Sequence, residues 1–269
     1  MSLPLPREHG TWAILLIPFL TATAIAGIFS PAVGVALLAV LLTFLVRAPL
    51  EAWLLPGSER RPVTVSPAQA RRWAAIYGTA AALSGLALII IWQRAQLVAV
   101  AALALMFLAL HVREVRRGAV LSWTAEGLGT LALTLSAPVA WIAATGGINA
   151  TGLLVWLLNA AFFTAGLIYV KLRIRALAAA HKPGAVPPAS GARQVLQFHL
   201  AVVLLVAGLV LGHWASPLVL LPFLLATARA GWGARRFGQR FSVRGLGWSE
   251  VAHSLVFGVL LVVAFRPWG

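Results

Sequence analysis

The feature that most constrains this chain is a series of long apolar runs separated by short polar segments. Hydrophobic residues make up 61% of the 269 residues and charged residues only 10%, whereas soluble domains carry about 25% charged residues. A membrane-spanning helix needs roughly 20 apolar residues, and most of the runs approach this length. The runs are rich in Ala, Leu and Gly without strict alternation, which favours helices over a β-barrel. We therefore predict an all-α, polytopic membrane helical bundle.

Nine runs are expected to cross the membrane. They comprise residues 11–29, 32–47 or beyond, 73–92, 97–112, 120–144, 153–170, 195–212, 217–228 and 248–265. Pro18, Pro138 and Pro222 lie inside these runs and are candidate helix breaks, because proline removes a backbone donor. The polar segments are too short for a soluble domain, so residues 1–269 are predicted to form a single transmembrane domain.

The basic residues are distributed very unevenly between the two ends of the expected spans. With a cytoplasmic N-terminus, the cytoplasmic segments hold 19 of the 21 Lys and Arg residues, and only Arg94 and Arg266 fall outside. An excess of Lys and Arg is typical of cytoplasmic loops. We predict a protein of the bacterial cytoplasmic (inner) membrane with its C-terminus outside. The net charge of +15 is attributed to this topology and not to nucleic-acid binding.

Ionisable side chains also gather at the cytoplasmic ends of the spans. Polar groups inside apolar spans are costly and mark functional sites, and arginine offers bidentate donors suited to phosphate. We expect one basic cavity that opens to the cytoplasm. The candidate ligand-binding residues are Arg7, Glu8, Arg47, Glu51, Arg60, Arg61, Lys171, Arg173 and Arg175.

Simpler explanations exist for several of these residues. Glu8 precedes the first helix, where a carboxylate meets the positive end of the helix dipole. Arg47 and Glu51 are four residues apart, a spacing typical of a plain ion pair. The basic residues at 171, 173 and 175 also fit the charge bias of a cytoplasmic loop, and alternate residues of a helix do not share one face.

Three residues are candidates for catalysis: His9, Glu126 and His253. Glu126 lies inside the fifth run and is expected to face the cavity and pair with an Arg or Lys. The two histidines are the candidate proton carriers near neutral pH. Glu250 and His253 share one helical face at a spacing used by metal sites in bundles, so they are the candidate metal ligands. The chain contains no Cys, which excludes disulfides and thiolate chemistry.

Two family resemblances add to this picture. The opening Pro6-Arg7-Glu8-His9-Gly10-Thr11-Trp12 resembles the start of the YwiC-like family of bacterial membrane proteins. More distantly, the architecture is similar to the UbiA superfamily of intramembrane prenyltransferases, which have nine helices and two cytoplasmic motif loops. Segment 60–70, RRPVTVSPAQA, and segment 186–192, VPPASGA, resemble the stretches that follow those two motifs.

The UbiA resemblance implies a bundle with a site for an isoprenoid diphosphate. That superfamily holds magnesium with Asp-rich motifs, and this chain has no Asp. Basic side chains stand near the expected motif positions, and they bind anions but cannot ligate magnesium. Magnesium in the usual Asp-rich form is therefore not expected, and no other cofactor is indicated.

We interpret the chain as an inner-membrane protein that binds an isoprenoid diphosphate or a similar anionic membrane lipid. Transfer of the prenyl group is left open, as is a divergent or inactive prenyltransferase-like protein. The alternative is a transporter of a small anion, which would need broken helices or polar groups at mid-depth. A scaffold without a ligand is the third interpretation.

Overall fold

The computed structural model describes residues 9–54, 66–117, 122–180, 189–236, 239 and 241–266. Within these ranges the regular structure is helical throughout. The elements are α1 (His9–Ala26), α2 (Pro31–Leu54), α3 (Pro67–Ile90), α4 (Leu97–Arg116), α5 (Trp123–Thr134), α6 (Ser136–Thr145), α7 (Ala150–Ala180), α8 (Ala189–Leu211), the 3-10 helix η1 (Pro217–Val219), α9 (Leu220–Ala234) and α10 (Val243–Phe265).

Each predicted span coincides with helical structure, so the predicted fold class is confirmed. In the described part of the chain, eight helical segments are long and apolar enough to cross a membrane, and Gly10–Ala26 forms a shorter apolar helix. The protein is therefore a multi-pass membrane protein. The eighth span, the weakest from sequence, is formed by η1 together with α9 and covers Pro217–Ala234.

Helix starts follow local capping chemistry. The hydroxyl of Ser66 accepts a hydrogen bond from the backbone N–H of Gln69, whose side chain bonds back to the cap, and Pro67 occupies the first turn of α3. This is a capping box with proline where its missing donor costs nothing. Ser122 and Ser242 cap α5 and α10 with a single bond each, accepted from the backbone N–H of Ala125 and of Gly245.

Several helices extend beyond the apolar runs that predict them. The run 153–170 becomes α7, which continues to Ala180. α8 begins at Ala189 and α10 at Val243, before their apolar runs start. Ala, Leu, Arg and Lys are strong helix formers, so the helix outlasts the hydropathy signal. Residues 171–175 and Arg229 are consequently helical, not parts of loops.

The fifth predicted span is divided into α5 and α6 at Leu135. Pro138 lies three residues further on, and its ring excludes the helical hydrogen bond to the carbonyl of Thr134. Leu135 instead donates to the carbonyl of Ala132 in a tighter turn. The predicted break at Pro138 is confirmed. Beyond it, Gly146 ends α6 with a left-handed φ of 100°, a conformation that glycine adopts without strain.

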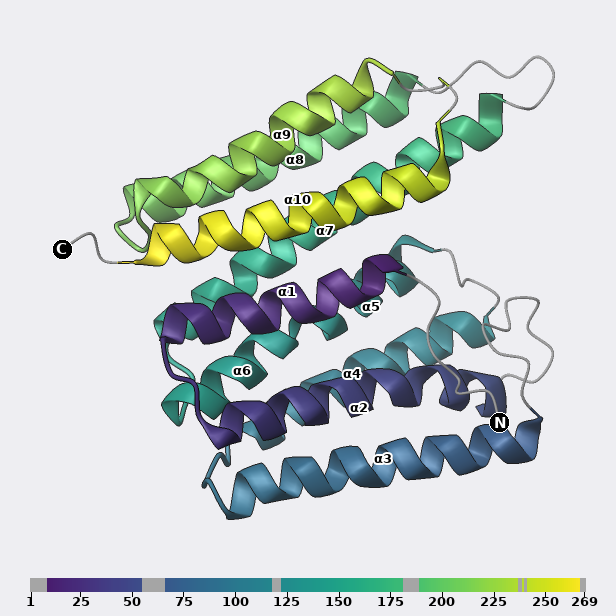
Figure 1. The fold of residues 1–269 in the computed structure, drawn as a ribbon. Coiled ribbons are helices and arrows are strands. Elements are labelled where there is room, and N and C mark those ends of the chain that lie inside the picture. Colours follow the sequence, from purple (N-terminus) through teal and green to yellow (C-terminus); the bar gives the residue numbers. More distant parts are fainter. Residues whose placement is uncertain are drawn as a thin grey trace.

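α1 lies in the middle of the bundle, where it contacts α5, α6, α7 and α10. α2 and α3 pair on one side, and α8 and α9 pair on the other. Figure 1 shows α3 at one edge of the molecule and the α8–α9 pair at the opposite edge, with α1 between them. The first helix thus joins segments that are distant in the sequence, including α10.

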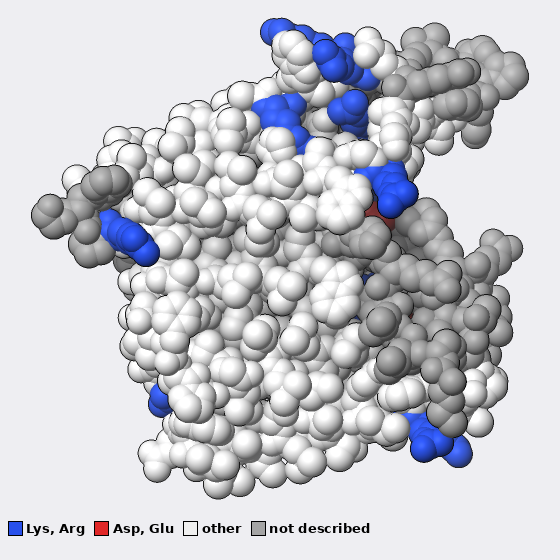
Figure 2. Space-filling view, in the orientation of Figure 1, with Lys and Arg blue, Asp and Glu red and all other residues white. Residues whose placement is uncertain are grey.

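The two ends of the bundle differ in charge. α1 begins, and α2, α4, α7 and α9 end, at what we call the basic end, on the right of Figure 1. At the opposite end, Arg94 and Arg266 are the basic residues of the described chain. Figure 2 shows a large uncharged surface across the middle of the molecule, with blue side chains toward its ends. This uncharged band is the surface that the lipid tails would cover.

Candidate functional site

The first group of charged residues, which we call the central cluster, consists of Arg47, Glu51, His111, Glu126 and Lys171. Arg47 Nε lies 2.7 Å from Glu51 Oε1 within α2, which is the ion pair that the spacing predicts. His111 of α4 places Nε2 3.5 Å from the same carboxylate oxygen and Nδ1 3.1 Å from the carbonyl oxygen of Ala125. His111 therefore ties α2 and α4 to the start of α5.

Glu126 completes the central cluster from the first turn of α5. Its Oε2 lies 2.5 Å from the Nζ of Lys171, whose ammonium also sits 4.4 Å from the ring centroid of Trp123. The predicted pairing of Glu126 with a basic residue is thus present in the structure. Lys171 is buried, and the carboxylate and the aromatic face together hold its charge. The start of α5 favours the Glu126 carboxylate, which lies in the first turn of that helix.

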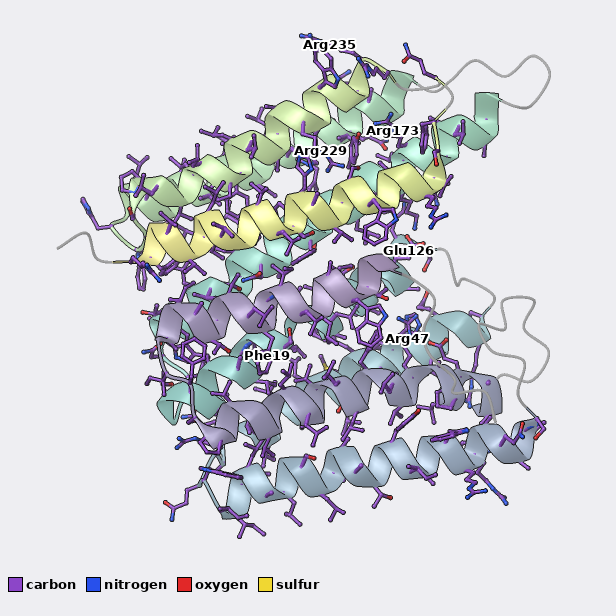
Figure 3. All side chains as sticks on the ribbon, in the orientation of Figure 1. Phe19, Arg47, Glu126, Arg173, Arg229 and Arg235 are labelled. Atoms are coloured by element: carbon purple, nitrogen blue, oxygen red, sulfur yellow. The ribbon has the colours of Figure 1, made fainter. Side chains whose placement is uncertain are left out.

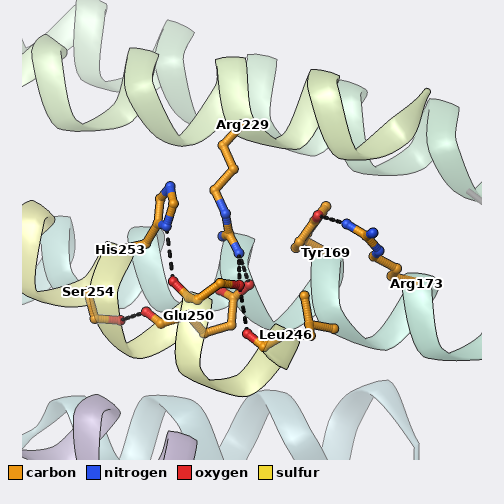
Figure 4. A network of polar contacts seen from close by, with 8 residues as sticks. Tyr169, Arg173, Arg229, Leu246, Glu250, His253 and Ser254 are labelled. Atoms are coloured by element: carbon orange, nitrogen blue, oxygen red, sulfur yellow. Dashed lines mark hydrogen bonds and ion pairs between the residues drawn. The ribbon is translucent and has the colours of Figure 1, made fainter. Parts of the chain in front are cut away.

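The second group, which we call the arginine cluster, consists of Tyr169, Arg173, Arg229, Phe241 and Glu250. Nη2 of Arg229 in α9 donates to Oε1 of Glu250 in α10. The same nitrogen donates to the hydroxyl of Ser249, also in α10, at 3.0 Å. Arg173 of α7 donates from Nη1 to the hydroxyl of Tyr169. Figure 4 shows Arg229 reaching down to Glu250 while Tyr169 and Arg173 lie beside it.

Aromatic faces hold both guanidinium groups of the arginine cluster. The Cζ of Arg173 lies 4.7 Å from the ring centroid of Phe241 and 5.7 Å from that of Tyr169. The Cζ of Arg229 lies 5.0 Å from the Tyr169 ring. Cation–π contacts of this kind orient a guanidinium without neutralising it.

The two clusters lie on opposite faces of α7. Successive residues of a helix are turned by about 100°, so Lys171 points away from Tyr169 and Arg173. Lys171 faces α5, whereas Tyr169 and Arg173 face α9 and α10. In Figure 3, Arg173 and Arg229 lie together near α9, while Glu126 and Arg47 lie toward α5 and α2. The single basic cavity expected from sequence is therefore replaced by two clusters, because one helix cannot direct alternate residues to one point.

Some predicted site residues lie outside the described chain. They are Arg7, Glu8, Arg60 and Arg61, together with the side chain of His9. Their place in a site stays a prediction. Arg175 is described and exposed, and its Cζ lies 5.0 Å from the Trp123 ring.

The predicted metal ligands are engaged in other contacts. Glu250 binds Arg229, and Nδ1 of His253 lies 3.0 Å from the carbonyl oxygen of Ser249. Among the residues that the structure describes, no group of three or more His, Cys, Asp and Glu side chains is placed to hold a metal ion. The described geometry therefore offers Glu250 and His253 no third side-chain ligand of this kind.

Arg229 is the functional candidate that sequence reasoning missed. The eighth run ends at residue 228, so the hydropathy pattern predicts a loop from Arg229 on, whereas the structure places Arg229 inside α9. Helix propensity beyond the apolar run is the signal that could have identified it. Its partner Glu250 is 21 residues away in the chain, and no spacing rule connects the two.

Comparison with known protein families matches residues 5–141 to the family described as YwiC-like protein. The chain belongs to the YwiC-like family. No curated protein and no solved structure matches it. The matched region of this YwiC-like protein reaches from the start of α1 to the middle of α6, so it includes Arg47, Glu51, His111 and Glu126 of the central cluster. The arginine cluster lies beyond it. The resemblance to the UbiA superfamily remains a prediction.

Proposed function

We propose that this YwiC-like protein binds an anionic amphiphile, such as an isoprenoid diphosphate or a similar anionic lipid, at its basic end. The head would be held by arginine and lysine side chains around α7, and the apolar tail would lie against the membrane-embedded helices. We further propose that the basic end faces the cytoplasm across the inner membrane, as the excess of Lys and Arg indicates.

The observation that carries this proposal is the charge balance of the arginine cluster. Arg173 and Arg229 both lie against Tyr169, and within the described part of the chain their one carboxylate partner is Glu250, which pairs with Arg229. A cation at this depth is costly without a counter-charge. An anionic ligand head would supply that charge, and arginine forms bidentate bonds with phosphate.

The packing next to the arginine cluster indicates that only the head of the ligand would lie between the helices. Phe162 of α7 stacks on Phe257 of α10 at 3.8 Å between centroids, and Phe223 of α9 meets the same ring edge-on at 5.6 Å. These rings belong to a closed apolar core between the three helices. A long tail would therefore follow the lipid-facing surface and not the interior.

Binding is better supported than transfer. Of the candidate catalytic residues, Glu126 is paired with Lys171 and His253 is bonded to Ser249. Basic side chains also provide no oxygen ligands for magnesium. A transfer activity would need the side chain of His9 or another group as its proton carrier.

Thermal unfolding of the purified protein with geranylgeranyl diphosphate tests the proposal. A ligand at about 100 times its Kd stabilises the folded state by about 2.7 kcal/mol, which is readily seen as a rise in Tm. Stabilisation without magnesium supports a cationic head site, and stabilisation that requires magnesium points to the glutamates as metal ligands. No rise in Tm with or without magnesium, at concentrations up to the solubility of the lipid, contradicts the proposal.

The proposed orientation can be tested by thiol labelling. The chain contains no Cys, so a single introduced cysteine is the one thiol that the reagent can label. Ala95 and Ala68 are both exposed, at the opposite and the basic end respectively. In intact cells a membrane-impermeant maleimide should label Ala95→Cys. It should label Ala68→Cys only after permeabilisation. The reverse pattern would place the basic end outside.

A small-anion transporter is the second candidate, favoured by the helix break at Leu135 between α5 and α6. α1 and α9 continue past Pro18 and Pro222, so the breaks expected there are not present. The fully buried Asn159 of α7 donates to the hydroxyl of Thr21 in α1 at 3.2 Å. Broken helices with polar groups at mid-depth form sites in transporters. Uptake of labelled phosphate into proteoliposomes, compared with empty vesicles, would test this candidate.

A further inference from the structure

We propose that the head of the anionic ligand binds in the arginine cluster, on the free edge of the Arg173 guanidinium beside Arg229. We further propose that Tyr169 is the residue that positions both arginines. This inference rests on the proposed function and specifies its ligand as an oxyanion with two oxygens available for side-by-side hydrogen bonds, such as a phosphate monoester or a diphosphate.

The hydrogen bonds of Arg173 leave one edge of its guanidinium available. Nη1 donates to the hydroxyl of Tyr169, and Phe241 covers one face of the group. Nε is buried and has no hydrogen-bond partner within the described chain. Nε and Nη2 form the fork that binds two oxygens of a phosphate in parallel. A buried donor of a charged group is costly to leave unpaired, so an acceptor is expected at this edge.

Arg229 contributes a second positive charge at the same place. Its Nη2 is held by Glu250 and Ser249, so the side chain has a defined direction. One carboxylate facing two arginines leaves a positive excess, which suits a ligand with more than one negative oxygen. Glu250 also lies close to α7, since a Cβ on Gly166 would be at an ordinary contact distance of 3.6 Å from Glu250 Oε2.

Tyr169 organises the cluster because it touches both arginines. Its hydroxyl accepts the bond from Arg173, and its ring lies under Arg229. The ring is buried and occupies space that a side chain at position 233 would need. A Cβ on Gly233 would lie 2.7 Å from a carbon of the Tyr169 ring. α9 can therefore approach α7 here only with glycine at position 233.

The central cluster is a poorer site for the same head. Its described cations, Arg47 and Lys171, are each paired with a carboxylate, at 2.7 Å from Glu51 and 2.5 Å from Glu126. An incoming anion would have to displace a carboxylate from the half-buried Arg47 or from the buried Lys171. The charge excess thus selects the arginine cluster.

The test measures the Kd of geranylgeranyl diphosphate for the full-length protein in nanodiscs of neutral lipid. Arg173→Gln should weaken binding about tenfold or more, as expected for losing charged hydrogen bonds. The matched control is Arg235→Gln, an exposed arginine at the end of α9, which should change the Kd by less than about threefold. Arg173→Lys keeps the charge but removes the fork, and it should also weaken binding about tenfold. It serves as the informative variant if Arg173→Gln does not fold.

Two further comparisons isolate Tyr169. Tyr169→Phe keeps the ring under Arg229 and removes the bond to Arg173, so it should weaken binding about fivefold, as for one lost hydrogen bond. Gly233→Ala should displace the ring and weaken binding at least as much. Gly231→Ala is its control, because a Cβ there meets only Leu196 at an ordinary 3.7 Å and should leave the Kd unchanged.

Geranylgeranyl diphosphate, geranylgeraniol and inorganic diphosphate together show whether the head, the tail or both are recognised. Geranylgeraniol should not bind if the head is recognised, and inorganic diphosphate should compete with the lipid if the head alone suffices. Binding of the lipid that is insensitive to Arg173 and Tyr169 but lost in Lys171→Gln would overturn this inference and leave the proposed function standing. Absence of binding by the unaltered protein would overturn both.

Discussion

The central cluster and the arginine cluster lie on opposite faces of the same helix, α7, yet they hold their cations by different means. In the central cluster, Arg47 and Lys171 each meet a carboxylate. In the arginine cluster, aromatic rings and a phenol hydroxyl hold two guanidinium groups against a single glutamate. Carboxylates neutralise a cation, whereas aromatic faces position it and leave its charge available.

This difference predicts a division of roles. The paired charges of the central cluster help to hold α2, α4, α5 and α7 together, so substitutions there should reduce stability. Cations that stay in excess are suited to ligand binding, so changes there should reduce affinity more than stability. The following variants test this division, from the largest expected effect to the smallest.

Glu126→Ala should have the largest effect on stability. It leaves the buried ammonium of Lys171 without its carboxylate, and breaking a buried pair in this way costs about 3 kcal/mol. Unfolding in a detergent and denaturant series measures the loss. The double variant Glu126→Ala/Lys171→Met should recover part of it, because no unpaired charge remains. If Glu126→Ala left the free energy of unfolding unchanged, the pair would have no structural role.

Glu250→Gln should cost less stability, about 2 kcal/mol, because both side chains of the pair with Arg229 are partly exposed. The glutamine amide can still accept a hydrogen bond from Arg229, but the positive excess of the cluster rises. Stability should therefore fall while affinity for an inorganic diphosphate is kept or increased. A loss of both would show that Glu250 positions Arg229 for the ligand and does not merely neutralise it.

His111→Leu should cost about 1 kcal/mol, the typical value for one internal hydrogen bond. The imidazole links Glu51 of α2 to the Ala125 carbonyl of α5, and leucine fills similar space without either contact. A double-mutant cycle with Glu51→Gln measures the pair alone and should give a coupling of about 0.5 kcal/mol or more. Strict additivity of the two changes would mean that the contact carries no energy.

Arg117→Ala should change stability by less than about 0.5 kcal/mol. Its Nη1 lies 3.5 Å from Glu114, but the arginine side chain is 61% exposed, and water screens such a pair. This variant supplies the baseline for the buried pairs at the same end of the bundle. An effect as large as that of Glu126→Ala would show that burial does not separate the two classes of ion pair.

Local features of the fold follow directly from the sequence. Long apolar runs define the spans, the Ser66-Pro67 pair defines the start of α3, and the four-residue spacing predicts the Arg47–Glu51 pair. Each of these depends on residues that are neighbours along one helix. The sequence also predicts that Glu126 pairs with some basic residue, because a lone carboxylate at this depth requires a partner.

The identity of distant partners is decided by the tertiary structure. Lys171 meets Glu126 because that face of α7 turns toward α5, whereas Tyr169 and Arg173 face the other way. Arg229 meets Glu250 because α9 packs beside α10. The rotation of a membrane helix is poorly encoded in its hydropathy, since lipid is as apolar as the bundle interior. The sequence by itself therefore determined the membrane spans and the basic end. Only the packing of α7 between α5 and the α9–α10 pair decided that the charges form two clusters, one balanced and one with a positive excess.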